Sequence, residues 1–340
     1  MPIKVNPDLK RSTKEARQLT YYTDGLRAGS RFILSEAITL IESEDQQKRI
    51  SGLSILDKLY TADASTKRIG ISGSPGVGKS TFINYIAGYL ASKGEKVAIL
   101  AIDPASQKTK GSILGDKTRM EEIGSNEMIY IRPSSAKFEL GGVADTTKEA
   151  IHLCEAAGFD TILIETVGVG QSETAVAQIV DLFCLLVLPG AGDELQGIKR
   201  GITELADLVI INKADQSRKE LASISQKHYA HSLHLLRPKI TNWTPRVLKS
   251  SSLEKRGIEK IWKAVETFFE ICHESGYFMA NRKEQNLNWF QKKFRQLAVE
   301  YYLKKEMNLK TFQKLETEIR SDRNNPFFAM KNLYETTFPR

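Results

Sequence analysis

The chain has 340 residues, of which 41% are hydrophobic and 26% are charged. This length allows about two domains and a core that needs no disulfide or metal to hold it. The composition excludes a disordered chain, a collagen and a small disulfide-rich protein. The net charge is +8, and residues 281–340 carry 13 Lys and Arg against 7 Asp and Glu. This excess suits an acidic partner, a phosphate ligand or nucleic acid, and the simpler explanation is a solvated basic helix face.

The cysteines Cys154, Cys184 and Cys272 are far apart in the sequence and form no CxxC pair. That pattern is typical of a reducing compartment. No run of about 18 apolar residues exists, so no membrane span is expected. Residues 1–20 lack the apolar stretch of a secretory signal. We therefore expect a cytoplasmic protein.

Three zones follow one another along the chain. Residues 1–65 are predicted to be a helical extension, because apolar residues recur at helical spacing after a possible N-cap at Ser30. Residues 66–270 alternate short apolar runs with amphipathic stretches, which predicts an α/β fold with a mostly parallel sheet covered on both faces. The expected strands are 68–72, 97–102, 128–131, 161–164, 182–188, 208–211 and 247–248.

The third zone, residues 271–340, returns to helix, and we expect Asn325-Pro326 to end it. An apolar stripe runs along this zone with spacings of 3, 4, 3 and 4, formed by Leu287, Phe290, Phe294, Leu297 and Tyr301. Such spacing is that of a short coiled-coil seam. Packing within one chain is the alternative explanation.

The strongest motif is Gly73-Ser74-Pro75-Gly76-Val77-Gly78-Lys79-Ser80, followed by Thr81. It fits G-x-x-x-x-G-K-[ST] between a predicted strand and a predicted helix, 79–90. The glycines let backbone N–H groups turn inward around phosphate oxygens, and the helix N-terminus adds partial positive charge. Lys79 is expected to reach the β- and γ-phosphates, and the Ser80 hydroxyl to bind Mg²⁺. The motif predicts a P-loop NTPase.

A second motif, Asn212-Lys213-Ala214-Asp215, lies at the end of the predicted strand 208–211. The Asp215 carboxylate can accept hydrogen bonds from N1–H and the 2-amino group of guanine, a donor pair that adenine lacks. Asn212 and Lys213 are expected to brace the loop. A helix cap is the alternative role of Asp215. The predicted ligand is therefore GTP or GDP.

Acidic side chains are expected to complete the site. Asp103 and Glu165 each follow a predicted strand, where side chains point into the ligand crevice of an open α/β sheet. Together with Asp116 they are assigned to Mg²⁺, which prefers oxygen ligands, and Asp103 or Glu165 to the hydrolytic water. A turn with Pro104 is the alternative for Asp103, and a helix cap for Glu165. Gly168 is expected to donate its backbone N–H to the γ-phosphate.

The segment 189–201 combines glycine with polar residues, among them Asp193, Glu194, Gln196 and Lys199. This mixture is typical of a mobile loop that senses the nucleotide. A plain connection between a strand and a helix is the alternative.

At these motifs the chain resembles the MeaB/ArgK family of P-loop GTPases, which includes the methylmalonic aciduria type A protein. The resemblance covers about residues 25–300 and is carried by the stretches 73–81, 103–104, 111–120, 165–173, 189–201 and 212–215. Glu165, where most GTPases carry Asp, is itself a mark of the group. The chain departs from the family at Lys249-Ser250-Ser251-Ser252, where Ser251 can still contact the guanine carbonyl through its backbone.

The resemblance implies a GTP-hydrolysing chaperone of adenosylcobalamin-dependent acyl-CoA mutases, typically methylmalonyl-CoA mutase. Such a chaperone gates cofactor loading and protects or reactivates the mutase. The resemblance also implies a homodimer formed through the C-terminal helical arm. It makes residues 189–199 an extra switch, with Gln196 and Lys199 as its working polar residues.

Other functions stay open. A metal-insertion GTPase usually carries a His-rich tract, and His228, His231 and His234 fall at spacings of three on a predicted helix. A GTP-dependent binding scaffold would keep the nucleotide motifs without useful turnover. An older family label, a kinase of an arginine transport system, predicts ATP, which Asp215 disfavours. No nucleic-acid or membrane partner is expected.

Overall fold

The computed structural model describes residues 18–61, 65–101, 124–133, 140–166, 171–190, 196–235, 240, 242–304, 306–321, 323 and 325–337. The chain divides into two compact units, Met1–Arg282 and Lys283–Arg340. No described helix has both the length and the hydropathy needed to cross a membrane.

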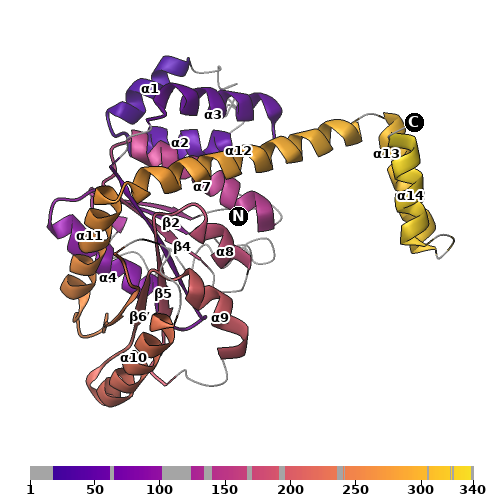
Figure 1. Cartoon of the computed structure of the whole chain (residues 1–340). Coiled ribbons are helices and arrows are strands. Elements are labelled where there is room, and N and C mark those ends of the chain that lie inside the picture. The colour runs from indigo at the N-terminus through magenta and orange to yellow at the C-terminus, as the bar shows by residue number, and fades with distance from the viewer. Residues whose placement is uncertain are drawn as a thin grey trace, which may run out of the picture. The chain divides into compact units, whose positions relative to one another are not determined.

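The first unit is built on a seven-stranded parallel sheet with the strand order β3-β2-β4-β1-β5-β6-β7 (Figure 1). Its strands are β1 Lys67–Gly73, β2 Val97–Ala101, β3 Ile129–Pro133, β4 Thr161–Glu165, β5 Leu182–Val187, β6 Leu208–Ile211 and β7 Arg246–Lys249. Each of the seven overlaps an apolar run of the sequence. The predicted parallel α/β sheet is confirmed, because buried strands of such sheets are apolar on both faces.

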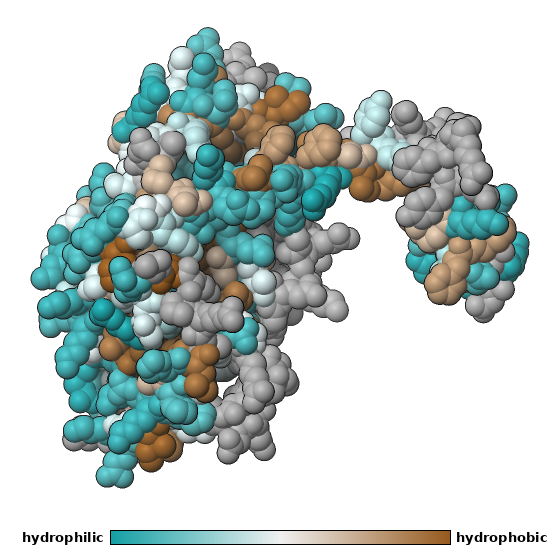
Figure 2. Space-filling view, in the orientation of Figure 1, coloured by the Kyte–Doolittle hydropathy of each residue, from teal (hydrophilic) through white to brown (hydrophobic). Residues whose placement is uncertain are grey.

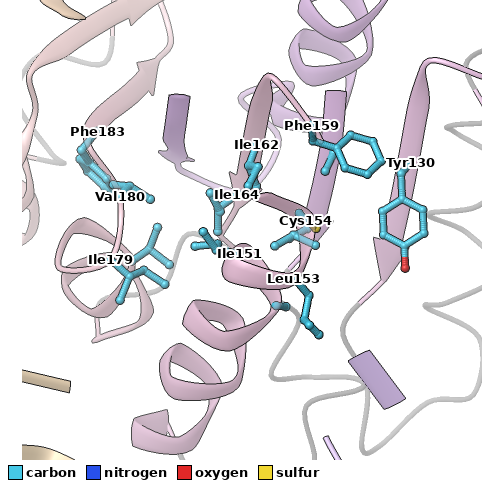
Figure 3. Packing of buried hydrophobic residues seen from close by; sticks show 14 of the residues in the cluster. Tyr130, Ile151, Leu153, Cys154, Phe159, Ile162, Ile164, Ile179, Val180 and Phe183 are labelled. Atoms are coloured by element: carbon cyan, nitrogen blue, oxygen red, sulfur yellow. The ribbon is translucent and has the colours of Figure 1, made fainter. Parts of the chain in front are cut away.

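Helices cover both faces of this sheet (Figure 1). Helices α4 (Lys79–Ser92) and α11 (Ile258–Glu274) pack into one apolar cluster with alternate strand residues such as Ile99 and Leu163. The other cluster takes the intervening strand residues and the helices α7 Leu140–Ala156, α8 Gln171–Ala177, α9 Gln196–Leu205 and α10 Lys219–His234. Figure 3 shows part of it, with β4 residues Ile162 and Ile164 beside Cys154. This alternation follows from the two-residue period of a strand.

Three N-terminal helices extend the second cluster. They are α1 Leu19–Arg27, α2 Arg31–Ile41 and α3 Gln46–Leu59. Leu34 and Ile38 of α2 are fully buried in that cluster, as the helical spacing predicts. The hydroxyl of Ser30 accepts a hydrogen bond from the N–H of Ile33, so the predicted N-cap is present.

The last three helices are α12 Tyr277–Lys304, α13 Glu306–Arg320 and α14 Pro326–Thr337. The prediction that Asn325-Pro326 ends the helical zone is wrong, because α14 begins there. Proline is favoured at the first helical position, where its missing N–H would have no helical partner. The side chain of Asn325 accepts a hydrogen bond from the N–H of Phe328 and caps the helix.

A buried ion-pair network lies at the start of β1. The carboxylate of Asp181 accepts two hydrogen bonds from Arg282, at 2.9 and 2.7 Å, and one from the N–H of Arg68, at 3.0 Å. The Arg68 guanidinium in turn pairs with Glu155 at 2.7 Å. Burial raises the pKa of Glu155, but a hydrogen bond with His152 and the charge of Arg68 outweigh this and hold that pKa at about 2. The network fixes the first turns of α12 to the strand that leads into the phosphate loop.

Replacement of Arg282 by Met is expected to lower the free energy of unfolding by about 3 kcal/mol, because it leaves the Asp181 carboxylate buried without its cationic partner. Urea denaturation measures the change. The control is Arg320→Met, since Arg320 is exposed and pairs with the exposed Glu316 one turn away, and should cost less than about 1 kcal/mol. The double variant Asp181→Asn/Arg282→Met should recover part of the loss, and independent, additive effects would contradict the pairing.

Candidate nucleotide-binding site

The phosphate loop joins β1 to α4 through three glycines with positive φ. At Gly73, φ is 153°, and a Cβ would lie 2.4 Å from the carbonyl oxygen of Leu186. At Gly78, φ is 92°, and a Cβ would lie 3.0 Å from the side-chain nitrogen of Asn212. Only glycine meets both demands without strain. The third, Gly76, has a φ of 79° and open space where a Cβ would stand.

Lys79 lies inside this loop and is almost fully buried. Its ammonium donates to the carbonyl oxygens of Gly73, at 2.9 Å, and Ser74, at 3.4 Å. The N-cap of α4 is Gly78, which has no side chain to cap the first turn. The loop therefore presents a lysine ammonium and the positive end of a helix dipole at one point, a combination that suits an anionic phosphate.

Two of the predicted Mg²⁺ ligands meet beside the loop. The Ser80 hydroxyl at the start of α4 donates to a carboxylate oxygen of Glu165 at the end of β4, at 3.0 Å. A hydroxyl and a carboxylate are the oxygen donors that Mg²⁺ takes in proteins, so these residues fit the ion. Asp103, Asp116 and Gly168 lie outside the described residues. Within the described part of the chain, no three His, Cys, Asp or Glu side chains form a metal-binding group, the histidines of α10 included.

The Asn212-Lys213 motif braces the phosphate loop. The Asn212 side chain donates to the carbonyl oxygen of Val77 at 2.8 Å, and the Lys213 ammonium donates to that of Gly76 at 2.7 Å. Asn212 is buried. These bonds join segments about 135 residues apart in the sequence. The structure thus places the predicted guanine motif directly against the predicted phosphate loop.

Asp215 is held by the loop that follows β7. Its carboxylate accepts a hydrogen bond from the Ser251 hydroxyl at 2.5 Å, and the same hydroxyl accepts one from the N–H of Glu254. A backbone bridge between Ser251 and Arg256 closes the loop. Asp215 precedes the short helix Gln216–Arg218 but makes no side-chain capping bond there. The alternative role as a helix cap is therefore not observed, and the carboxylate is oriented by Ser251.

The Ser251 hydroxyl is a contact that sequence reasoning missed, since only the backbone of that residue was expected to act. A cavity of about 1300 Å³ opens beside the same loop. Its lining includes Thr81, Tyr85, Ala214 and Ser251. Neither Asp215 nor any residue of the loop 73–80 is among the described lining residues, so this cavity borders the base motif and does not enclose the phosphate loop.

The remaining switch residues are only partly placed. Gln196 and Lys199 belong to the first turns of α9. Asp193 and Glu194 lie outside the described residues.

The comparisons with known proteins agree with this site. The family model described as "Methylmalonyl Co-A mutase-associated GTPase MeaB" matches residues 34–307. The GTPase ArgK of Escherichia coli (strain K12) is 40% identical over 310 residues, which are 91% of this chain and 94% of the relative. The mitochondrial methylmalonic aciduria type A homolog of Caenorhabditis elegans is 41% identical over 324 residues, covering 92% of this chain and 81% of that protein.

Among solved structures, the crystal structure of an LAO/AO transport system kinase superposes with a TM-score of 0.74 at 34% identity. The match covers 94% of this chain and 97% of that one. The sequence matches, the fold and the geometry of the phosphate and base motifs agree, and the chain belongs to the MeaB family of P-loop GTPases.

Proposed function

We propose that this GTPase is a chaperone of an adenosylcobalamin-dependent acyl-CoA mutase, with methylmalonyl-CoA mutase as its client. In this role it gates loading of the cobalamin cofactor and protects or reactivates the mutase. The observation that carries the proposal is the match of residues 34–307 to a family described by its association with that mutase. The relative in Caenorhabditis elegans, named for methylmalonic aciduria, supports it.

The bound species in this proposal are GTP or GDP and Mg²⁺. Ser80 and Glu165 would hold the ion, with Asp103 and Asp116 contributing directly or through water. When bound, Mg²⁺ neutralises charge that develops on phosphate oxygens. Lys79 and the loop amides stabilise the transferring phosphoryl group, and Asp103 or Glu165 orients the attacking water. Gly168 would donate its backbone N–H to the γ-phosphate.

The segment preceding and entering α9 would couple hydrolysis to the client. Asp193 and Glu194 come just before the helix, and Gln196 and Lys199 in its first turns. Glycine-rich polar loops that follow a strand are typical of nucleotide sensors. We assign these four residues to the switch.

GTP turnover by the purified protein, alone and with each of a panel of acyl-CoA mutases, tests the client. Slow intrinsic hydrolysis and a large stimulation by methylmalonyl-CoA mutase are expected. Stimulation by a different acyl-CoA mutase would keep the chaperone role and change the client. If every mutase leaves both the rate and the nucleotide affinity unchanged, the chaperone proposal fails. Turnover no faster than spontaneous hydrolysis would favour the alternative of a GTP-dependent scaffold.

We further propose a homodimer formed through α12. The stripe of Leu287, Phe290, Phe294, Leu297 and Tyr301 is exposed, with Phe294 at 63% and Tyr301 at 68%. Figure 2 shows brown and tan side chains along the helix that Figure 1 labels α12. A second copy of the same stripe would cover these side chains at coiled-coil spacing.

No nucleic-acid or membrane partner is proposed. The three cysteines are free and buried, which suits the proposed cytoplasmic location.

Light scattering after size-exclusion chromatography should give the wild-type protein twice the chain mass of 38.2 kDa. Phe290→Ser/Phe294→Ser should give a monomer, because the two aromatic side chains lie at the centre of the stripe. The control Phe32→Ser changes an equally exposed phenylalanine on α2 and should stay dimeric. A dimer that survives the double substitution would place the interface elsewhere.

A further inference from the structure

A fully buried carboxyl group lies beneath the phosphate loop, at Glu173 in the first turn of α8. One of its oxygens accepts a hydrogen bond from the Ser72 hydroxyl at 2.7 Å. The other oxygen is buried and has no hydrogen-bond partner among the described residues. Burying a carboxyl group costs far more free energy than burying an apolar side chain of similar size, unless the carboxyl group is paired or fully hydrogen-bonded. Packing alone does not explain this one.

The carboxyl group is the acceptor at the end of a directed chain of hydrogen bonds. The Thr166 hydroxyl donates to the Ser72 hydroxyl at 2.9 Å, and the Ser72 hydroxyl donates to Glu173. The N–H of Thr166 also donates to the carbonyl oxygen of Ile71, at 3.1 Å. Thr166, Ser72 and Glu173 all have 0% exposed surface. Because each hydroxyl donates only one proton, the chain needs an acceptor at its end.

The chain joins the two strand ends that carry the chemistry. Ser72 comes immediately before Gly73, whose carbonyl oxygen accepts a hydrogen bond from the Lys79 ammonium. Thr166 comes immediately after Glu165, whose carboxylate accepts a hydrogen bond from the Ser80 hydroxyl. The bond between the hydroxyls therefore fixes the separation between the lysine side and the Mg²⁺ side of the site.

We infer that Glu173 is a positioning residue for GTP hydrolysis. It acts through Ser72 and Thr166 to hold the ends of β1 and β4 in the register that the reaction needs. The role rests on the GTPase activity and not on the identity of the client. Misplacement of catalytic groups by about 1 Å can cost about 100-fold in rate, so the carboxyl group can affect turnover without touching the nucleotide.

The apolar neighbour of Glu173 on α8 supplies a control. Val176, one turn later, is buried against Gly70 of β1, where an added Cβ would lie 3.0 Å from the valine side chain. Gly70 and Ser72 are two residues apart and so lie on the same face of the strand. Val176→Ala weakens the packing of α8 on β1 but leaves the three hydrogen-bonding groups unchanged.

Intrinsic GTP hydrolysis without any mutase tests the inference, with kcat, KM for GTP and melting temperature measured for each variant. Glu173→Leu should lower kcat about 100-fold with a change in KM below about threefold. Thr166→Val, which removes the donating hydroxyl at nearly constant shape, should lower kcat about tenfold. Glu173→Gln keeps an acceptor oxygen for Ser72 and should recover most of the activity. Val176→Ala should lower the melting temperature and leave kcat near wild type.

The inference is overturned if Val176→Ala lowers kcat as much as Glu173→Leu does, because the effect would then come from packing alone. It is also overturned if Thr166→Val leaves kcat unchanged. Should Glu173→Leu fail to fold, Thr166→Val and Glu173→Gln still decide the matter. None of these outcomes depends on whether a mutase stimulates the wild-type protein.

Discussion

Asp215→Asn is expected to transfer the nucleotide preference from GTP to xanthosine triphosphate. The carboxylate offers two acceptor oxygens to the N1–H and 2-amino group of guanine, whereas an asparagine amide offers one acceptor and one donor. Xanthine has a carbonyl in place of the 2-amino group, so it matches the amide. A site built to hydrogen-bond a polar group of its ligand rejects an analogue that lacks this group by about 10⁴-fold. We therefore expect the ratio of the affinities for GTP and xanthosine triphosphate to change by about 10⁴-fold.

Equilibrium binding of the two triphosphates to wild-type and variant protein measures this ratio. Ser251→Ala is the matched control, because it removes the hydroxyl that orients Asp215 and keeps the carboxylate. That control should weaken the binding of GTP without any gain for xanthosine triphosphate. An unchanged affinity for GTP in Asp215→Asn would show that this carboxylate does not hydrogen-bond the guanine base.

The sheet could be predicted from the sequence because its strands are local features. Each strand is a short apolar run. A strand that is buried on both faces has such a run whichever strands it pairs with. The phosphate loop was equally readable, since its glycines are required by backbone conformation at Gly73 and Gly78. Strand order within the sheet leaves no such local mark.

What could not be predicted depends on contacts between distant segments. The bond between Ser251 and Asp215 joins residues 36 apart, and the pair Arg282–Asp181 joins residues 101 apart. Nothing in the local pattern around Glu173 distinguishes a buried acceptor from an acidic residue in the first turn of an exposed helix. At Asn325-Pro326 the local rule was ambiguous, because a proline can end one helix and begin the next.

Lys79→Met is expected to lower kcat for GTP hydrolysis about 1000-fold at saturating nucleotide. The Lys79 ammonium donates hydrogen bonds to the carbonyl oxygens of Gly73 and Ser74, inside the loop. Removal of a single preorganised charge donor from a site of this kind costs about 10²–10³ in rate, and a full charge on a transferring phosphoryl group lies at the upper end. Methionine keeps most of the aliphatic stem, so the loop should stay folded.

Lys213→Met is the variant to compare with Lys79→Met. Lys213 also donates a hydrogen bond to this loop, at the carbonyl oxygen of Gly76, but it belongs to the base motif. Its substitution should weaken nucleotide binding and cost less than about tenfold in kcat, since its charge braces the loop and does not face the transferring group. Lys79→Arg should not restore the rate, because a planar guanidinium cannot replace a compact ammonium in a closed loop. Single-turnover hydrolysis separates chemistry from product release in all three variants. If Lys79→Met retains more than about a tenth of the wild-type rate, the charge that stabilises the reaction must come from another residue.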